Sequence, residues 1–249
     1  MIVGKNVVKD FGAGAEGARA LDGVDVEINA GEFVAVMGPS GSGKTTLLFT
    51  LSGTDGVSSG SVTLNGTELS RLREDELADI RRGSIGFVFQ QPTMLRNLNI
   101  LDNIILPALF GNKKNRAEIT KKAMELMDRT GIAGLENRDI TEVSGGQLQR
   151  AGICRALINS PEILFADEPT GALNSKSADE VMDLLADINR DGTAILIVTH
   201  DAKVAARAGR VLFTKDGKIV CDLPLGDAGS VDMDSRMEKV FTQMSAVGI

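Results

Sequence analysis

The segment best suited to chemistry is the glycine-rich run GPSGSGKT at residues 38–45, which is followed by Thr46. It fits the spacing G-x-x-x-x-G-K-[ST] and stands between an apolar run typical of a strand and the run TTLLFTL, which favours a helix. In such a loop, backbone N–H groups surround phosphates, a lysine adds positive charge, and a hydroxyl binds Mg²⁺. We therefore predict a site for a nucleoside triphosphate. The residues of this predicted phosphate loop are Gly38, Pro39, Ser40, Gly41, Ser42, Gly43, Lys44, Thr45 and Thr46, with Thr45 as a metal ligand.

A pair of adjacent carboxylates, Asp167 and Glu168, closes the apolar run ILFADEP at residues 163–169. We expect Asp167 to hold Mg²⁺, directly or through water, and Glu168 to polarise an attacking water. Neighbouring residues of a strand point to opposite faces, but Pro169 indicates that the chain bends here, so both carboxylates can serve one site. The alternative is an ordinary acidic pair at the surface.

His200 and Gln90 also follow short apolar runs, AILIVT and GFVF. A lone histidine is more often structural than chemical. In parallel α/β sheets, however, ligands bind outside the carboxyl ends of the strands, where the phosphate loop and the carboxylate pair are also expected. We therefore predict that His200 senses the phosphate or acts on the transition state. The amide of Gln90 is a candidate ligand for Mg²⁺ or the attacking water, although a loop glutamine usually has no such role.

A second glycine-containing segment, EVSGGQLQR at residues 142–150, leads into a run that favours a helix. Backbone N–H groups at a helix N-terminus, together with the helix dipole, are suited to bind a phosphate. This segment contains no lysine, whereas the phosphate loop has Lys44. The residues thus predict a second, lysine-free phosphate cradle and raise the question of its purpose.

The run GAGAEG at residues 12–17 fits G-x-G-x-x-G, the fingerprint of dinucleotide sites. That motif works only where a helix follows, because the pyrophosphate binds at the helix N-terminus. Here the run ARALDGVDVEI follows, which favours a turn and a strand. We therefore expect no dinucleotide site at these residues.

The composition, with 43% hydrophobic and 24% charged residues, is that of a globular protein. The net charge of −7 argues against a polyanion as the main partner, so we expect no nucleic acid to bind. No apolar run reaches the roughly 20 residues that a membrane helix needs, and the N-terminus lacks the layout of a signal peptide. Cys154 and Cys221 fit no metal or redox spacing and are expected to be reduced thiols of a cytosolic protein.

The elements that must position these residues alternate between strands and helices. Nearly continuous apolar runs at residues 33–38, 163–168 and 194–200 predict central strands that are covered on both faces. Residues 175–190 predict a helix with one apolar face, and Gly192 stands just past its end. This alternation indicates an α/β fold with a parallel sheet.

Other regions depart from this plan. Residues 1–35, 60–66 and 84–89 favour strands with turn signals, so we expect a small antiparallel sheet. Residues 98–160 favour helices almost throughout and are expected to form a subdomain inserted into the α/β core. From residue 232 the tail favours a helix that packs on the chain's own core, with a partner contact as the alternative. The apolar residues of this tail are Met233, Met237, Val240, Phe241 and Met244.

The phosphate loop, Gln90, VSGGQ, ILFADE and His200, in this order, make the chain resemble the ATP-binding cassette (ABC) family of transporter ATPase subunits. The resemblance extends from about residue 2 to residue 222. It implies an α/β fold with a P-loop NTPase (RecA-like) core and its parallel sheet, an N-terminal antiparallel β subdomain and an inserted helical subdomain. The expected parts are a nucleotide-binding domain at residues 1–230, its helical subdomain at about 92–160, and a C-terminal helical extension at 231–249.

The resemblance also gives the second cradle a purpose. Cassettes of this family pair head-to-tail, and VSGGQ resembles the signature loop that caps the ATP held by the other copy. The resemblance implies ATP and Mg²⁺ as cofactors, an ATP-dependent homodimer, and hydrolysis that moves an integral membrane permease through the helical subdomain. The chain is then expected to be cytoplasmic and peripheral on the inner face of the membrane. The implied catalytic residues are Lys44, Glu168 and His200, the metal ligands are Thr45, Gln90 and Asp167, and the residues acting in trans are Ser144, Gly145, Gly146 and Gln147.

Three further positions are interpreted through the resemblance. The family usually stacks an aromatic residue on adenine near the N-terminus, and Phe11 falls at that place; the alternative is a core phenylalanine. The run GALN ends in Asn174, where many relatives have aspartate, which puts the strength of coupling between the two ATP sites in question. Val143 replaces the commoner leucine before the signature serine, a small change in packing.

Within the family, the runs RRGSIGFVFQQPTML, LDNIILP and FADEPTGALNSKSADEVM are most similar to cassettes that serve macrolide exporters, lipoprotein release and antimicrobial-peptide resistance. The similarity implies export of, or resistance to, antimicrobial peptides or antibiotics, or a process of the lipoprotein-release type. Soluble ATPases of DNA repair or translation are disfavoured, because the chain has one cassette and no sustained heptads between Lys44 and Glu142. A cassette that signals through a membrane protein without transport is the open alternative.

Overall fold

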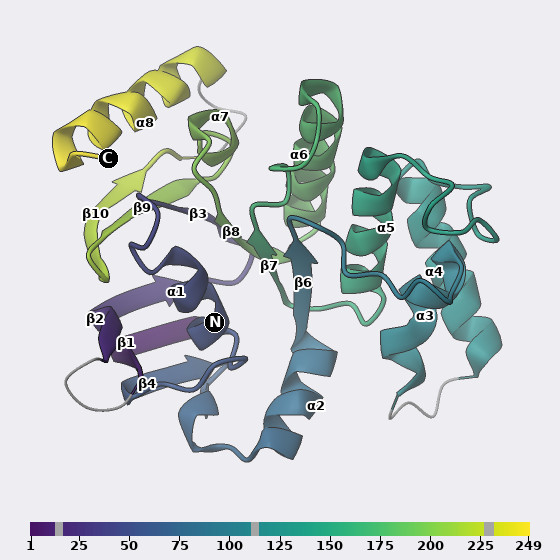
Figure 1. Ribbon diagram of the computed structural model, residues 1–249, viewed down its shortest axis with the longest axis horizontal. Coiled ribbons are helices and arrows are strands. Elements are labelled where there is room, and N and C mark those ends of the chain that lie inside the picture. The colour runs from purple at the N-terminus through teal and green to yellow at the C-terminus, as the bar shows by residue number, and fades with distance from the viewer. Residues whose placement is uncertain (13–16, 111–114, 227–231) are drawn as a thin grey trace. The chain divides into compact units, whose positions relative to one another are not determined.

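The computed structural model describes residues 1–12, 17–110, 115–226 and 232–249 and divides into two compact units. The first unit joins residues 1–78 to residues 194–249, and the second comprises residues 79–193 (Figure 1). Along the chain, the second unit is therefore an insertion between the two parts of the first. Residues 13–16 of the dinucleotide-like run and the expected domain boundary at residues 230–231 lie outside the described residues.

The first unit contains the expected antiparallel sheet, with the strand order β2-β1-β4-β5. In β2, buried Val24, Val26 and Ile28 alternate with exposed charged residues, so one face of the strand packs on a core and the other meets solvent. Asn65 and Gly66 have φ of 49° and 80° in the tight turn between β4 and β5. The strands are β1 (Ile2–Phe11), β2 (Ala18–Ile28), β4 (Ser59–Leu64) and β5 (Thr67–Glu68), followed by the short helix η2 (Leu69–Arg71).

A second sheet in this unit has the strand order β10-β9-β3-β8. β3 is parallel to both β8 and β9, and every residue of β3 and β8 is buried, as their continuous apolar runs predicted. Val36 lies opposite Val198, so β3 and β8 end at the same edge. The elements are β3 (Phe33–Met37), β8 (Ala194–Val198), β9 (Arg210–Lys215) and β10 (Lys218–Pro224), with the helices α1 (Lys44–Leu51), α7 (Ala202–Ala205) and α8 (Met233–Val247).

In the second unit, β6 (Ile85–Phe89) pairs in parallel with β7 (Ile163–Asp167). We expected residues 84–89 in the antiparallel sheet, and that expectation is wrong. β6 is a short, largely buried run, and Gly86 lets it approach its neighbours closely, because a Cβ there would lie 2.4 Å from Leu164 Cδ2. Burial of this kind is typical of a parallel strand.

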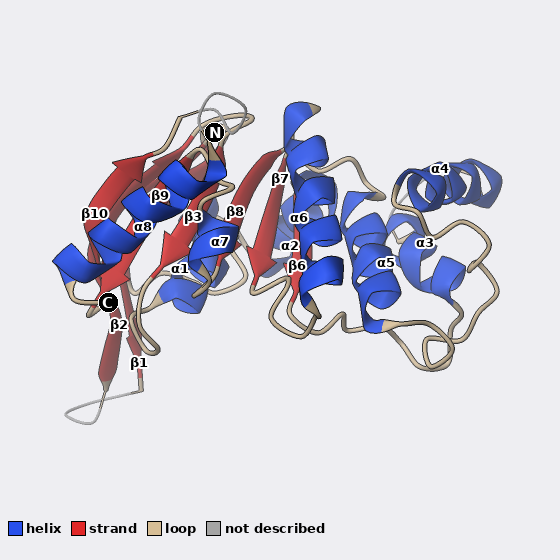
Figure 2. Ribbon diagram, turned by 90° about the horizontal axis from the view of Figure 1, so that it is seen from above, coloured by secondary structure: helices blue, strands red, loops and turns tan. Residues whose placement is uncertain are grey.

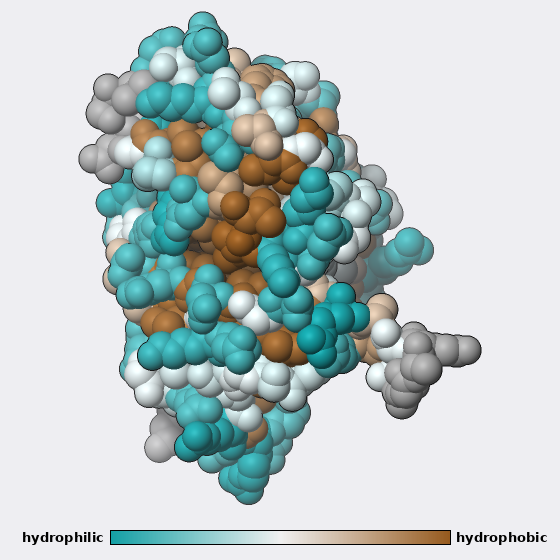
Figure 3. Space-filling view, turned by 90° about the vertical axis from the view of Figure 1, so that its left-hand side faces the viewer, coloured by the Kyte–Doolittle hydropathy of each residue, from teal (hydrophilic) through white to brown (hydrophobic). Residues whose placement is uncertain are grey.

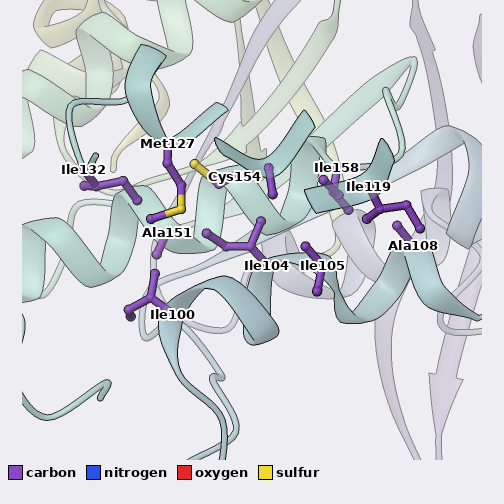
Figure 4. Packing of buried hydrophobic residues seen from close by; sticks show 11 residues of the cluster. Ile100, Ile104, Ile105, Ala108, Ile119, Met127, Ile132, Ala151, Cys154 and Ile158 are labelled. Carbon is purple, nitrogen blue, oxygen red and sulfur yellow. The ribbon is translucent and has the colours of Figure 1, made fainter. Parts of the chain in front are cut away.

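Helices α3, α4 and α5 of the second unit lie together around an apolar core (Figure 2). In Figure 4 the side chains of Ile104, Met127 and Cys154 lie between these helices. Burial raises the pKa of the Cys154 thiol to about 11, and its Sγ lies 3.1 Å from Thr130 Oγ1. Cys154 and Cys221 are both free cysteines. The helices of this part of the chain are α2 (Glu74–Ser84), α3 (Ile100–Leu109), α4 (Arg116–Arg129), α5 (Gly145–Leu157) and α6 (Ser175–Arg190).

The expectation that residues 98–160 are helical almost throughout is wrong for residues 130–144. These residues form turns between α4 and α5, where Gly131 and Gly134 have φ of 67° and 85° and interrupt the helical repeat. Helix α6 has the predicted bounds. Its buried face contains Val181, Met182, Leu185 and Ile188.

The C-terminal helix α8 forms as predicted, but its inward face differs from the prediction. Val240 is fully buried, whereas Phe241 is 55% exposed, so the expectation that Phe241 packs on the core is wrong. Arg236 is buried instead, and its guanidinium donates to Ala206 O at 2.7 Å and Leu225 O at 3.0 Å.

Apolar residues also reach the surface, as Figure 3 shows for the side that lies on the left of Figure 1.

Candidate functional site

The phosphate loop lies in the first unit, between the end of β3 and the start of α1. Glycine is required at two of its positions for geometric reasons. Gly43 has φ of 93°, and a Cβ on it would lie 2.4 Å from Ala20 O. A Cβ on Gly38 would lie 2.3 Å from Thr214 O. The glycines therefore allow the loop to pass close to the backbone on two sides.

A threonine that the sequence analysis missed anchors this loop from β9. Thr214 Oγ1 donates to Met37 O at 3.1 Å and lies 2.8 Å from Ser42 Oγ. Both side chains are buried, so the Ser42 hydroxyl serves to hold the loop to β9. The only signal for Thr214 in the sequence was a polar residue at the end of the apolar run RVLFT.

The loop borders a pocket of about 330 Å³. Phe11 lines this pocket and is 44% exposed, so the alternative of a core phenylalanine is wrong. Lys44 Nζ donates to Gly38 O at 2.8 Å and Pro39 O at 2.9 Å, which places its positive charge at the loop. The pocket thus combines an aromatic ring, an ammonium group and threonine hydroxyls. Its lining residues are Phe11, Ala20, Gly41, Gly43, Lys44, Thr45 and Thr46.

His200 follows β8 in the same unit and is exposed. Because Val36 of β3 lies opposite Val198 of β8, His200 leaves the sheet at the edge from which the phosphate loop also starts. Thr199 N donates to Val36 O at 3.1 Å, and Thr199 Oγ1 accepts from Asp201 N at 3.0 Å. The backbone on both sides of His200 is therefore fixed by hydrogen bonds.

The two carboxylates lie in the second unit. Asp167 is the last residue of β7, and Phe89, the last residue of β6, lies opposite it. Glu168 has φ of 47°, in the left-handed region that non-glycine residues rarely occupy. Gly171 N donates to Glu168 O at 3.0 Å and closes a turn, in agreement with the bend inferred from Pro169. Both carboxylate residues are partly exposed, and a strained backbone of this kind is concentrated at functional sites.

Gln90 follows Phe89 directly, so it leaves the β6–β7 pair at the same edge as Glu168. Its amide lies against the turn after Glu168, since a Cβ on Gly171 would approach Gln90 Nε2 to 2.8 Å. Gln149 of α5, which the sequence analysis missed, is 1% exposed and donates from Nε2 to Phe89 O at 2.9 Å. The second unit thus brings Gln90 to the carboxylate turn and connects the strand before it to α5.

The lysine-free cradle forms the N-terminus of α5. Ser144 Oγ accepts from Gln147 N at 3.3 Å, and Ser144 N donates to Gln147 Oε1 at 2.8 Å, which is a capping box. Ser144 and Gly145 are exposed, whereas Gly146 is buried, and a Cβ on it would lie 2.8 Å from Ser177 Oγ of α6. Three of these residues therefore have local roles in capping α5 or in its packing on α6.

The two departures from the family pattern also have local roles. Asn174 is the N-cap of α6, where its Oδ1 accepts from Ser177 N at 3.0 Å. Aspartate is an equally good N-cap, so the helix itself does not choose between the two residues. Val143 packs against the apolar core of α3, α4 and α5, in the packing role that we expected.

In the part of the chain that the structure describes, no three His, Cys, Asp or Glu side chains are grouped to hold a metal ion. Thr45, Gln90 and Asp167 carry a hydroxyl, an amide and a carboxylate, and such oxygen donors are compatible with Mg²⁺, which typically binds one or two carboxylates together with phosphate oxygens and water. Separately, none of the helices within the described ranges is long and apolar enough to cross a membrane.

Comparison with known proteins places these features in a family. The sequence matches the family described as ABC transporter over residues 21–171. It is 44% identical over 223 residues to the bacitracin export ATP-binding protein BceA of Halalkalibacterium halodurans, with 89% of this chain and 88% of that protein covered. It is 43% identical over 223 residues to the macrolide export ATP-binding/permease protein MacB of Chlorobaculum tepidum, with 90% of this chain and 34% of that protein covered. The chain thus spans about a third of the MacB relative.

Solved structures agree with this assignment. The chain matches a dimeric structure of a post-hydrolysis state of the ATP-binding cassette MJ0796 bound to ADP and Pi, with a TM-score of 0.84, 40% identity, and 90% of this chain and 99% of that chain covered. It also matches cbiO1 from Clostridium perfringens, part of an ABC transporter complex, with a TM-score of 0.82, 26% identity, and 99% and 96% covered. These matches confirm the predicted P-loop NTPase α/β fold. The chain belongs to the ABC transporter family and is one of its ATP-binding cassette ATPases.

Proposed function

We propose that the chain binds and hydrolyses MgATP and thereby drives an integral membrane permease that exports antimicrobial compounds. The observation that carries the proposal is the pocket of the first unit, where the ring of Phe11 borders the same space as Lys44 and Thr45. A ring, an ammonium group and a hydroxyl suit the base, the phosphate chain and the metal ion of MgATP. The surrounding fold matches a solved cassette that contains ADP and Pi.

Each part of the substrate has a proposed partner in this chain. Backbone N–H groups of residues 40–46 and the Lys44 ammonium bind the phosphates, and Phe11 stacks on adenine. Thr45, Gln90 and Asp167 supply a hydroxyl, an amide and a carboxylate oxygen to Mg²⁺. When bound, Mg²⁺ neutralises negative charge on the phosphate oxygens.

Hydrolysis needs a water that is oriented toward the γ-phosphorus. Glu168 polarises this water by accepting a hydrogen bond from it, and His200 donates a hydrogen bond to a γ-phosphate oxygen. The water oxygen forms a bond to the γ-phosphorus as the bond from that phosphorus to the bridging oxygen breaks. Glu168 accepts the proton that the water loses and returns it to the phosphate product, and ADP and inorganic phosphate leave. The turn at Glu168 and the hydrogen-bonded backbone beside His200 support these roles, because both orient a side chain before the substrate binds.

The lysine-free cradle completes the site of a second copy in this proposal. Ser144, Gly145, Gly146 and Gln147 contact the γ-phosphate of ATP held by the partner's phosphate loop. The capping box supports this role, because it forms the N-terminus of α5 before a partner arrives. The match to a dimeric cassette supports the pairing of two copies. ATP then joins the two copies, and hydrolysis separates them.

The proposed substrate class rests on the relatives, which are named for the export of bacitracin and of macrolides. A permease that exports such compounds places this chain at the cytoplasmic face of the membrane. The test is drug resistance of cells that express the chain with its permease. Resistance that is lost in the Glu168→Gln variant supports coupled transport. ATP hydrolysis stimulated by the drug, with unchanged drug accumulation in the cells, would instead support a signalling cassette.

Phosphate release by the purified chain tests the catalytic assignment. We expect Glu168→Gln to bind MgATP and to lower the hydrolysis rate about 100-fold or more. We expect Lys44→Ala to weaken the binding of MgATP itself. Glu118→Gln, at an exposed position in α4, is the matched control and should leave the rate unchanged. Full activity of Glu168→Gln would overturn the assignment of Glu168.

A further inference from the structure

The ring of Phe11 has a cation on one of its faces. Lys9 Nζ lies over the ring, 5.1 Å from its centroid, a distance at which an ammonium group is attracted to the π-electrons of the ring. The Lys9 side chain is 12% exposed, so this charge is largely withdrawn from water. Phe11 itself is 44% exposed and lines the nucleotide pocket.

Two oxygen atoms hold the Lys9 ammonium in this place. Lys9 Nζ donates to Asp55 Oδ1 at 2.8 Å and to Gly56 O at 2.7 Å. Asp55 follows the end of α1, and its backbone N–H donates to Phe49 O at 3.0 Å. The helix that starts in the phosphate loop thus ends in the turn that positions Lys9. The phosphate loop and the ring of Phe11 are thereby connected through helix α1 and the ion pair between Lys9 and Asp55.

We propose that Lys9 is a positioning residue for recognition of the nucleotide base. Its ammonium, fixed by Asp55, holds the ring of Phe11 so that the base stacks on a surface that is already ordered. An ordered ring loses less conformational entropy when the base binds than a free ring does. This smaller entropy cost raises the affinity for the nucleotide. This inference rests on the proposed role of Phe11 as the platform for adenine, and it adds the residue that orients the platform.

The effect of Lys9 on binding of the base can be distinguished from an effect on binding of the phosphates. Lys9→Met removes the charge and keeps most of the length of the side chain. We expect it to raise the Kd of MgADP about 3- to 10-fold, the range that a partly buried cation–π contact supports. The Kd of magnesium pyrophosphate, which has phosphates and no base, should change by less than about twofold. Lys9→Arg should restore most of the MgADP affinity, because guanidinium also binds to aromatic faces.

Isothermal titration calorimetry with MgADP and with magnesium pyrophosphate is the experiment, and neither ligand is hydrolysed to complicate it. Lys5→Met, an exposed lysine in the same strand, is the matched control and should bind both ligands as the wild type does. Asp55→Asn is a second variant that keeps Lys9 and removes its anion, and it should weaken MgADP binding in the same direction. Thermal unfolding with each variant checks that the chain is folded.

Each outcome decides a different claim. If Phe11→Ala weakens MgADP binding and Lys9→Met does not, the inference about Lys9 is overturned and the adenine platform stands. If Lys9→Met weakens pyrophosphate binding as much as MgADP binding, Lys9 supports the fold rather than the base, and the inference is overturned. If Phe11→Ala leaves MgADP binding unchanged, Phe11 is not the platform, and both the inference and that part of the proposed function fail.

Discussion

The two glycine-containing cradles of this chain use glycine for different reasons. In the phosphate loop, Gly43 avoids a backbone atom, since a Cβ on it would lie 2.4 Å from a carbonyl oxygen at φ of 93°. At the N-terminus of α5, a Cβ on Gly146 would lie 2.8 Å from Ser177 Oγ and 2.9 Å from Ser177 Cβ of α6. The Ser177 hydroxyl can rotate aside, but its Cβ is fixed to the backbone of α6. Glycine in the first cradle is therefore required by a positive φ and a close carbonyl oxygen, whereas glycine in the second allows two helices to pack closely.

The cradles also differ in how their polar groups are used. The phosphate loop is anchored by the buried pair Ser42 and Thr214 and has Lys44 at its end. The N-terminus of α5 is neutral, satisfies Ser144 and Gln147 within its own capping box, and is exposed at Ser144. An anchored and charged loop can hold a triphosphate in one copy, whereas a neutral, preformed helix end is suited to close over a phosphate already bound elsewhere.

The largest effect is expected for Gly43→Ala. An L-residue at φ of 93° adds strain of about 1–3 kcal/mol, and the backbone contact forces the loop to move as well. We expect the Kd of MgADP to rise about 100-fold or more, measured by calorimetry. Gly83→Ala is the matched control, because a Cβ on Gly83 meets no atom within 4 Å in the part of the chain that the structure describes. Unchanged binding by Gly43→Ala would show that the loop is not fixed as described.

Ser144→Arg should separate binding from hydrolysis. The added side chain fills the exposed end of α5 in the proposed interface, so we expect hydrolysis to fall about 100-fold, as it does when a phosphate or oxyanion donor is removed. MgADP binding in the same chain should change by less than about twofold. Asn115→Arg removes the N-cap of another helix, α4, and controls for lost capping. Wild-type hydrolysis by Ser144→Arg would argue against a composite site.

Thr214→Val tests the anchor of the phosphate loop and should have a moderate effect. The substitution leaves Met37 O and Ser42 Oγ without this partner in a buried setting, which is expected to lower the free energy of unfolding by about 1–3 kcal/mol. Thr50→Val removes a buried hydroxyl that has no hydrogen-bond partner among the described residues, so it should be neutral or stabilising. Chemical denaturation of the two variants measures the difference. Equal effects at both positions would contradict the anchoring role of Thr214.

The smallest effect is expected for Asn174→Asp. Both residues cap α6, and the added negative charge at a helix N-terminus contributes about 0.3–1 kcal/mol of stability. Asn174→Ala removes the cap and should lower stability by about 1 kcal/mol. Thermal unfolding measures whether stability rises in Asn174→Asp and falls in Asn174→Ala. A loss of stability in Asn174→Asp would show that the amide group has a partner other than the helix.

The sequence was most informative where a feature depends on neighbouring residues. Helix α6, the buried strands β3 and β8, and the phosphate loop each have a local signal of period, composition or spacing. Thr214 could not be found in this way, because its partner Ser42 is 172 residues away in the chain. The parallel partner of β6 was missed for the same reason, since a short apolar run does not specify which strand it pairs with.

Arg236 and Phe241 show a second limit of sequence patterns. Helical spacing identified α8, but it assigned the inward positions by hydrophobicity alone. Arg236 is buried because backbone carbonyl oxygens accept its hydrogen bonds, whereas Phe241 is left exposed. The burial of Arg236 depends on carbonyl oxygens just after α7 and β10, which come together only in the folded chain.

The most direct test of the central claim is the solution mass of the Glu168→Gln variant with and without MgATP. Light scattering with refractive-index detection suits this chain, which has no Trp or Tyr and absorbs little at 280 nm. We predict a shift from a 26.3 kDa monomer to a dimer when MgATP is added, and no shift when Ser144→Arg is also present. A monomer in both conditions, or a dimer that forms equally well with Ser144→Arg, would contradict the claim that the lysine-free cradle completes a shared ATP site.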